Sequence, residues 1–175
     1  MQDVMIDIET LDTSPSAVIL SIGAVRFDVE NLGAIGDSFH RHIDIESNLK
    51  YGRTVSGSTI LWWLDQDAMA RKNITSAQTE SLYAVLGQLG QFIKPNDRVW
   101  GNGASFDNVI LGDAYRRCDL PQPWRYWSDM CYRTLKNVYK HVPKPKFEGV
   151  EHDALDDARY QALHLQAIYQ HIKQK

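Results

Sequence analysis

The chain has 175 residues, of which 43% are hydrophobic and 23% are charged, and its formal net charge is −3. We expect residues 1–175 to form a single domain, because this length and hydrophobic fraction suffice for one substantial core. The negative net charge argues against a large, non-specific surface for duplex nucleic acid, which is normally strongly basic.

The first predicted element is a buried β-strand over residues 4–9 that carries two acids. Because side chains alternate along a strand, Asp7 and Glu9 point to one face, opposite the neighbouring isoleucines. Two adjacent carboxylates repel each other and lose hydration on an apolar strand, so a fold retains such a pair when a cation lies between them. Oxygen ligands on a rigid strand suit Mg²⁺ or Mn²⁺. The pair therefore makes a metal site the first hypothesis for this protein.

Two further strands are predicted over residues 18–27 and 38–45, and with the first they are typical of an antiparallel meander. His40 and His42 alternate with Phe39, Arg41 and Ile43 in the third strand. We interpret these histidines as part of a polar sheet face, with metal ligation as the alternative.

Two helices are predicted next, over residues 60–72 and 80–93. Thr59 can cap the first of them. Trp62 and Trp63 are neighbours in that helix and point about 100° apart, so they cannot both face the core. One of them could stack on a nucleic-acid base, but we favour a core or dimer contact.

A short strand over residues 98–101, a loop containing Gly103 and a helix over residues 106–117 follow. This order places Asp107 in the first helical turn, just beyond the edge of the sheet. Ser105 and Asp107 can simply cap the helix and stabilise its dipole. The functional alternative is an acid that faces the same cleft as the first strand.

The segment over residues 130–147 contains several basic residues and no acidic one. We expect a helix over residues 131–140, followed by a loop that two prolines stiffen. Lys144 and Lys146 directly precede the next motif and could reach a phosphate backbone, whereas a solvated helix face is the alternative. The bases of the segment are Arg133, Lys136, Lys140, Lys144 and Lys146.

The last predicted helix, over residues 153–172, has His152 at its start and Asp157 within it. A stripe of alanines every four residues allows this helix to pack closely on a sheet, which would bring Asp157 against the sheet. Asp153 and Asp156 suit the dipole of the first turn, so Asp157 is the metal ligand that we predict. The alternative is an acidic helix start beside a solvated histidine.

These motifs resemble, in their order, the DEDDh branch of the DnaQ-like 3′–5′ exonucleases, and the resemblance runs from Asp7 to Asp157. It is strongest to small bacterial and phage proteins that are often called exodeoxyribonuclease VIII-like. The defining motifs are Asp7-Ile8-Glu9, Phe106-Asp107 and His152-x-Ala154-x-x-Asp157. The subgroup is further indicated by Asp7-Ile8-Glu9-Thr10-Leu11, Ser21-Ile22-Gly23-Ala24-Val25, Trp62-Trp63, Trp100-Gly101-Asn102-Gly103-Ala104-Ser105-Phe106-Asp107 and Arg133-Thr134-Leu135.

The resemblance implies an RNase H-like α/β fold, with a mixed five-stranded sheet of an antiparallel meander plus parallel strands, flanked by helices. It also implies two divalent ions, Mg²⁺ or Mn²⁺, that Asp7 would bridge. Glu9 and Asp157 would hold the ion that activates water, and Asp107 would act on the second ion, mostly through water. His152 would be the general base. Two ions about 3.5–4 Å apart can stabilise both the attacking and the leaving oxygen of a phosphodiester, and histidine is suited to accept a proton near neutral pH.

The resemblance also suggests substrate contacts. Thr10 and Leu11 would line the pocket of the terminal nucleotide, with Leu11 against its base. Asn102 and Phe106 would border the substrate, although Phe106 also suits the core. Many relatives carry His-Asn where this chain has Asn102-Gly103, so the usual contacts of those two side chains lack an equivalent here.

We therefore predict a metal-dependent enzyme that hydrolyses phosphodiester bonds at the 3′ end of single-stranded or short-overhang DNA or RNA and releases nucleoside 5′-monophosphates. One alternative is a binding module that has lost catalysis, but no acid of the motif is missing. The other is a metal-dependent phosphatase or endonuclease. No side chain indicates a contact to the 2′-OH, so the choice between DNA and RNA stays open. Homodimers are frequent among the relatives and are a plausible assembly.

The sequence also predicts a cytoplasmic protein without membrane association. The longest apolar stretch, residues 17–25, is too short to span a bilayer, and the first strand begins so close to Met1 that we expect no signal peptide. Cys118 and Cys131 match no zinc motif and are expected to be free thiols.

Overall fold

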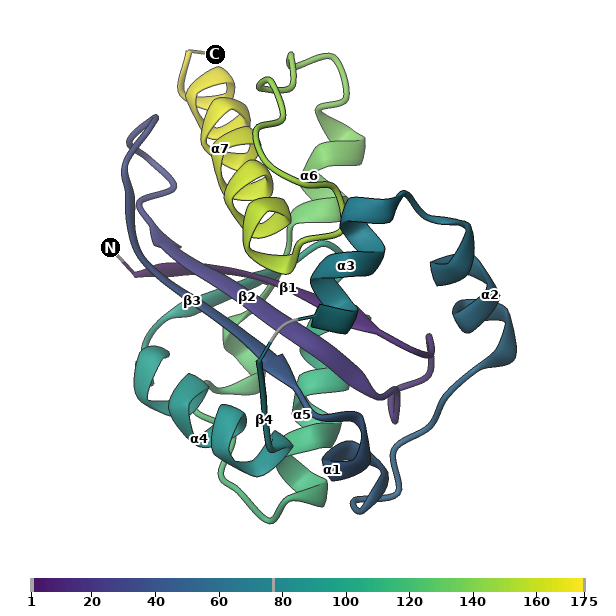
Figure 1. The fold of residues 1–175 in the computed structure, drawn as a ribbon. Helices are drawn as coiled ribbons and strands as arrows, with labels where there is room; N and C mark the ends of the chain where they lie inside the picture. Colours follow the sequence, from purple (N-terminus) through teal and green to yellow (C-terminus); the bar gives the residue numbers. More distant parts are fainter. Residues whose placement is uncertain (1, 77, 175) are drawn as a thin grey trace.

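The computed structural model describes residues 2–76 and 78–174, and these form one mixed sheet of six strands in the order β4-β3-β2-β1-β5-β6 (Figure 1). The predicted meander is present, since β1, β2 and β3 pair antiparallel. The strand β5 pairs parallel with β1, and β4 and β6 extend the two edges in parallel. The sheet has one strand more than expected, because these edge strands are too short to show an alternating pattern. The strands are β1 (Asp3–Thr10), β2 (Ile19–Phe27), β3 (Ile35–Ile43), β4 (Thr79–Glu80), β5 (Arg98–Gly101) and β6 (Asp129–Cys131).

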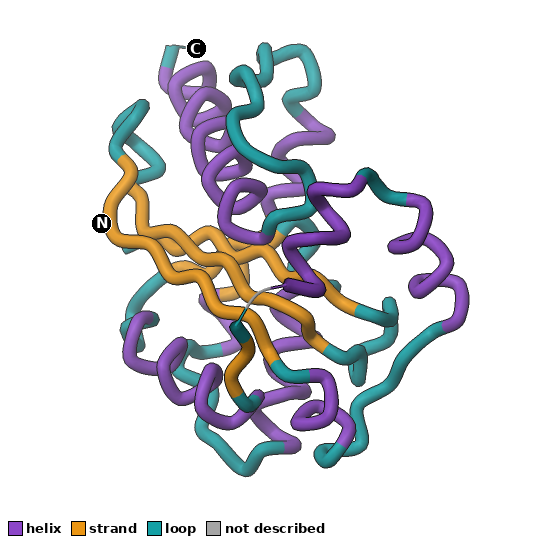
Figure 2. Tube along the Cα trace, in the orientation of Figure 1, coloured by secondary structure: helices purple, strands orange, loops and turns teal. Residues whose placement is uncertain are grey.

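Helices cover both faces of this sheet (Figure 2). On one face lie α4 and α5, and on the other α6 and α7. The helices of the described residues are α1 (Ile45–Leu49), α2 (Gly57–Asp65), α3 (Ala68–Ser76), α4 (Leu82–Phe92), α5 (Asp107–Arg117), α6 (Tyr132–Val138) and α7 (Ala154–Lys173), with a short 3-10 helix at Tyr126–Ser128.

The two faces of β1 lead into two different apolar clusters. Ile6 and Ile8 pack with buried side chains of α4 and α5, whereas Met5 packs with those of α7. Asp7 and Glu9 alternate with the isoleucines and therefore face α7, as the strand pattern predicts. Burial of each large apolar side chain contributes about 1.5–3 kcal/mol, so the clusters hold β1 rigidly beneath its acids.

The start of α7 lies against the sheet at a glycine. A Cβ on Gly23 of β2 would lie 2.1 Å from the backbone carbon of Ala154, and Gly23 pairs with Asp7 across the two strands. Ala158 and Ala162 are fully buried and continue the close contact along the helix, as the alanine stripe predicts. The first turns of α7 therefore come close to the strand that carries Asp7.

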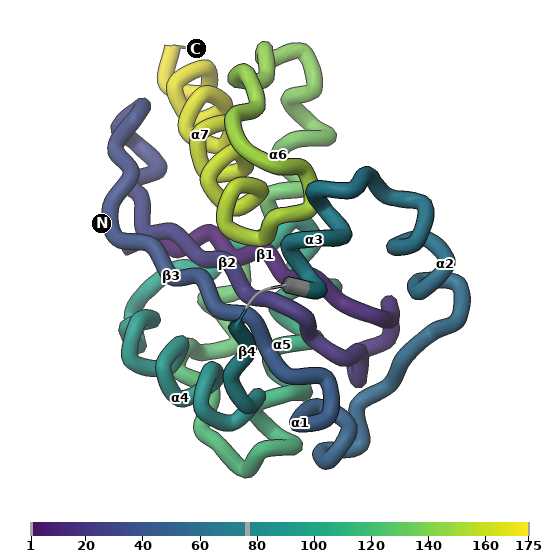
Figure 3. Tube along the Cα trace, in the orientation of Figure 1, coloured from purple at the N-terminus to yellow at the C-terminus, as the bar shows by residue number. Residues whose placement is uncertain are grey.

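The helix predicted over residues 60–72 is instead two helices, α2 and α3. The first begins after Ser56, before the predicted cap at Thr59. The Asp67 carboxylate accepts hydrogen bonds from two N–H groups of the first turn of α3, at 2.7 and 2.9 Å, and this cap starts a new helix. Figure 3 shows α3 beside the start of α7, where Asn73 donates to Asp153 at 3.2 Å.

The fold also bears on the predictions about membrane spans and cysteines. In the described ranges, none of the helices has the length and apolarity needed to cross a membrane. Cys118 and Cys131 are both free, as predicted.

The contact at Gly23 gives a stability prediction. Gly23→Ala should lower the free energy of unfolding by about 1–3 kcal/mol, because the new Cβ would overlap backbone atoms that cannot rotate aside. Urea denaturation measures this loss. The matched control is Gly87→Ala in α4, where a Cβ meets nothing within 4 Å and should stabilise the helix by about 0.5–1 kcal/mol. Equal effects of the two substitutions would contradict the close packing.

Candidate active site

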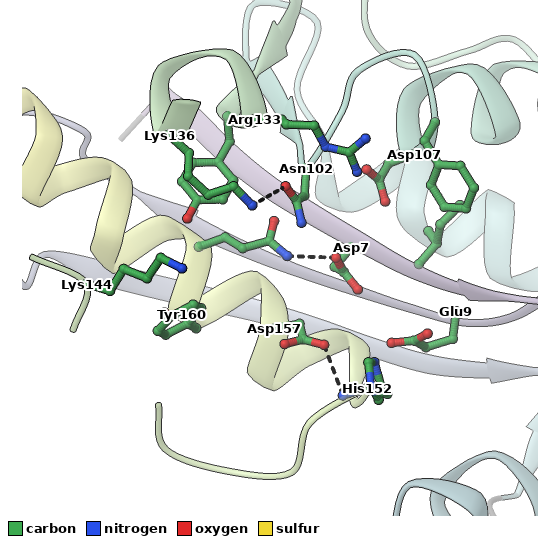
Figure 4. Close-up of a pocket in the computed structure, with 14 residues that line it drawn as sticks. Asp7, Glu9, Asn102, Asp107, Arg133, Lys136, Lys144, His152, Asp157 and Tyr160 are labelled. Carbon is green, nitrogen blue, oxygen red and sulfur yellow. Dashed lines mark hydrogen bonds between the residues drawn. The ribbon is translucent and has the colours of Figure 1, made fainter. Parts of the chain in front are cut away.

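The acids of β1 lie in a pocket between the sheet and α7 (Figure 4). Asp7 accepts a hydrogen bond from the Gln161 side-chain amide of α7 at 2.8 Å. Burial, with the nearby carboxylates of Asp107 and Asp157, raises the pKa of Asp7 well above its ordinary value. Burial and the charge of Asp7 likewise raise the pKa of Glu9, whose side chain is almost completely buried. The fold therefore holds these carboxylates in an environment that disfavours their negative charge.

Asp107 reaches the same pocket from the start of α5. A Cβ on Gly101, at the end of β5, would lie 3.0 Å from Asp107 Oδ2, so the glycine leaves space for the carboxylate. Burial raises the pKa of Asp107 to about 7, against smaller opposing effects of backbone N–H groups and Arg133. Oδ2 is buried and has no hydrogen-bond partner among the described residues. Its carboxylate faces the cleft, as the functional interpretation of the sequence requires.

Asp157 and His152 come from the first turns of α7 and the residues just before it. The backbone N–H of His152 donates to Asp157 Oδ2 at 3.1 Å, and His152 has a φ of 63°, in the left-handed region that is uncommon for residues other than glycine. Burial raises the pKa of Asp157 to about 6. Asp153 accepts from the N–H groups of Leu155 and Asp156, at 3.1 and 3.2 Å, and so serves the helix start as predicted.

Two tryptophans surround the imidazole of His152. The ring centroids of Trp62 and His152 are 4.9 Å apart, and those of Trp63 and His152 are 6.1 Å apart, both edge-on. Trp63 is buried, and its Nε1 donates to the carbonyl oxygen of Thr10 at 2.8 Å, whereas 43% of Trp62 is exposed. Only Trp63 faces the core, as predicted for two neighbours of one helix, although the two rings are also in edge-on contact with centroids 5.0 Å apart.

The donor set of this pocket fits a hard divalent cation. Glu9, His152 and Asp157 each offer one ligand atom, and these atoms lie within 4.8 Å of one another. The unpartnered Oδ2 of Asp107 adds a further oxygen donor. A cation among these groups would relieve the repulsion that raises the pKa of the carboxylates.

The same pocket has a basic end. Arg133 and Lys136 of α6 and Lys144 of the following loop line it together with the acids. Lys136 Nζ donates to the Asn102 side-chain oxygen at 3.2 Å, and Tyr160 of α7 closes the side near Lys144. One pocket thus contains clustered carboxylates, Arg133 beside Asp107, and Lys136 and Lys144 further from the acids.

The predicted substrate contacts are only partly brought together. Asn102, Phe106 and Lys144 line the pocket of the acids, and Thr10 lines an adjoining apolar pocket with Trp62 and Trp63. Leu11 is partly buried and packs with the apolar cluster around Trp63 and Val18. Lys146 lines a separate depression beside Asp156 and Arg159.

Several pocket residues were not predicted as site residues. Gln161 follows Asp157 by four residues, so it lies on the same helix face, and this spacing is the signal that could have indicated it. Arg133 and Lys136 stood out as members of the acid-free segment, and Arg133 also as part of the Arg133-Thr134-Leu135 motif, but neither was assigned a role in the site. Tyr132 and Tyr160 carry no signal in the sequence that separates them from core aromatics.

Comparisons with known proteins agree with this geometry. The family model described as the 3′–5′ exoribonuclease Rv2179c-like domain matches residues 2–169. An exodeoxyribonuclease of Enterobacteria phage T4 is 26% identical over 191 residues, which cover 90% of this chain and 84% of that protein.

Two solved structures show the same fold. The nuclease domain of 3′hExo, described as a DEDDh family member bound to rAMP, has a TM-score of 0.58 and 17% identity, and the match covers 98% of this chain and 91% of that one. Exonuclease X in complex with 5′ overhanging duplex DNA has a TM-score of 0.57 and 16% identity, over 96% of this chain and 91% of that one.

These likenesses confirm the predicted RNase H-like α/β fold class. The match of the family model covers nearly the whole chain, and the acids of the DEDDh motifs meet in one pocket. The chain therefore belongs to the 3′–5′ exoribonuclease Rv2179c-like domain family and is a 3′–5′ exonuclease of the DEDDh type.

Proposed function

We propose that the enzyme uses two divalent ions, Mg²⁺ or Mn²⁺, to remove nucleoside 5′-monophosphates from single-stranded or short-overhang 3′ ends of DNA or RNA. The observation that carries the proposal is the convergence of four carboxylates, from β1, α5 and α7, in one pocket beside His152. The relatives include an exoribonuclease family and an exodeoxyribonuclease, so both sugars belong in the proposal.

The four acids would hold the ions in distinct ways. Asp7 has both Asp107 and Asp157 near its carboxylate, so it would share both ions. Glu9 and Asp157 would hold one of them, since their oxygens and His152 form a compact group. Asp107 would serve the other. When bound, the ions supply a nucleophile at neutral pH and stabilise charge on the attacking and leaving oxygens.

His152 would take the proton from the attacking water. Its backbone is held by Asp157, and its ring is held between the edges of Trp62 and Trp63. This arrangement keeps the imidazole at the rim of the acid cluster without a side-chain hydrogen bond to another described residue.

The adjoining apolar pocket would receive the terminal nucleoside. It shares Ile8, Glu9 and Phe106 with the pocket of the acids, and Thr10 and Trp62 line its wall. Trp62 is exposed enough to stack on a base, an interaction typically worth about 1–3 kcal/mol. Pockets of this kind fit an unpaired end better than a continuous duplex.

A digest of matched single-stranded DNA and RNA, each labelled at its 5′ end, tests the activity. We expect stepwise shortening with Mg²⁺ or Mn²⁺ and none with EDTA. Blocking the 3′ end should stop the reaction, whereas an endonuclease would still cut the blocked strand. No shortening of either strand with either metal would refute the proposal.

Replacing His152 tests the general base. His152→Ala should lower turnover by about 10²–10⁴, while its affinity for Mn²⁺, measured by titration calorimetry, stays close to that of the wild type. Asp7→Asn is the comparison and should lose both turnover and metal affinity. If His152→Ala loses as much metal affinity as Asp7→Asn, His152 is a metal ligand and not the base.

The raised pKa values predict a pH effect on the metal-free protein. The folded-state pKa of Asp107, about 7, lies above the ordinary value of about 3.9 in an unfolded chain. The folded state therefore binds more protons between these values, and this group's contribution to stability falls as pH rises through about 4–7. His42 and His164, whose pKa values burial lowers, act in the opposite direction.

A comparison with Asp107→Asn isolates this contribution. In urea denaturation with EDTA, the stability of the wild type relative to Asp107→Asn should fall as pH is raised from about 5 to about 8. Because bound metal must displace the same proton, the affinity of the wild type for Mn²⁺ should rise over that range. A pH-independent stability difference would contradict the raised pKa.

A further inference from the structure

The basic end of the active-site pocket has no role in holding metal. Arg133, Lys136 and Lys144 project into this end from α6 and the loop after it (Figure 4). Lys136 and Lys144 lie away from the acids, with Asn102 beside Lys136, whereas the Arg133 guanidinium lies next to the Asp107 carboxylate. We refer to the three basic residues as the basic triad.

None of the members of the basic triad forms an ion pair with another described residue. Within residues 2–76 and 78–174, no ion pair joins any of its members to a carboxylate, whereas Arg26, Arg53 and Arg98 each pair with an aspartate. Lys136 is half-buried and donates to the neutral amide oxygen of Asn102. Arg133 also lies near Asp107, whose pKa its charge lowers. Three neighbouring cations that form no ion pair create a positive potential that an anionic ligand would neutralise.

Lys136 shows how close these charges are. Burial and the nearby cations Arg133 and Lys144 lower its pKa. Its Nζ lies 5.2 Å from the centroid of the Tyr132 ring, a favourable cation–π distance that holds the amine in the pocket. The side chain is therefore positioned in spite of the repulsion from its neighbours.

The place of Arg133 depends on a glycine. Gly103 has a φ of +116°, and a Cβ there would lie 3.1 Å from Arg133 Cζ. The guanidinium therefore lies close to the backbone at position 103. This is the motif position at which the chain departs from the His-Asn of many relatives, so the missing side chain leaves space for Arg133.

The opposite end of the site sets the direction of the strand. The apolar pocket beside Glu9 has no lysine or arginine among its lining residues. A 3′-terminal nucleoside has no phosphate beyond it, so this pocket suits it. On the other side of the scissile bond every nucleotide brings a phosphate. Lys136 and Lys144 lie on that side of the acids, and Arg133 lies next to Asp107 (Figure 4).

We propose that the basic triad is a subsite for the phosphodiesters immediately 5′ to the scissile one. The inference rests on the proposed function, because the scissile phosphate must lie at the acids. The ligand class is the anionic backbone of a single strand. The subsite would bind the charge of the backbone irrespective of base sequence, since phosphate contacts position a strand without identifying its bases.

The test uses oligonucleotides in which one phosphodiester is replaced by a neutral methylphosphonate. The replacement lies at the first, second or sixth linkage 5′ to the scissile bond, and kcat/KM is measured for release of the first nucleotide. For the wild type we expect a loss of about tenfold at the first or second linkage, the size of one charge-assisted hydrogen bond. No loss is expected at the sixth linkage.

Lys136→Met makes the test specific. This variant should lose about tenfold on the unmodified strand but little more when the linkage that it contacts is neutral, because each change removes the same interaction. If circular dichroism shows that Lys136→Met fails to fold, Arg133→Met replaces it in the same comparison of variant and neutral linkage. The matched control is Lys140→Met, an exposed lysine just beyond α6 that does not line the pocket, and it should keep the wild-type pattern.

Two results would overturn the subsite. One is an equal wild-type rate on all the modified strands. The other is that each variant lowers kcat/KM by the same factor on the strand with the neutral linkage as on the unmodified strand, which would mean that the two changes act independently. Failure of the proposed function is distinct from both, since the wild type would then not shorten even the unmodified strand.

Discussion

The close approach of α7 to the sheet is the contact on which the site depends. Gly23 and Ala154 bring backbone against backbone where a larger residue would separate them. Asp157 and Gln161 lie in the next turns of the same helix, and Gln161 reaches Asp7 directly. A displacement of α7 by the width of one methyl group would therefore move Asp157 and Gln161 away from the other three carboxylates.

This packing concentrates charge that folding alone would disfavour. Burial raises the pKa of four carboxylates in one pocket, and repulsion by the other site acids adds to this at Asp7 and Glu9. The apolar clusters on both faces of β1 hold the acids in place against this repulsion. The Gln161 amide offsets a part of it at Asp7, and a side-chain donor of this kind also orients a carboxylate. The stability of the fold thus maintains a site that is prepared for a cation.

The pocket also has a polarity that suits a strand with a direction. Apolar and aromatic side chains lie on one side of the acids, and Lys136 and Lys144 lie on the other. The tryptophans of α2 connect the apolar side to the histidine, because Trp62 touches the imidazole and also lines the nucleoside pocket. Binding of the strand end and placement of the proposed general base, His152, are therefore physically linked.

The local sequence determined the strands of the meander, the alternation that separates Asp7 and Glu9 from the isoleucines, and the alanine stripe of the last helix, because these follow from the periodicity of each element. Its motifs also predicted the four acids of the pocket and His152. Tertiary structure alone decided that Gln161, Arg133 and Lys136 belong to the pocket and that Leu11 and Lys146 do not line it. The physical reason is that the distances of α6 and α7 from the sheet determine which of these residues line the pocket. That distance depends on packing at Gly23 and Gly103, between segments far apart in the chain.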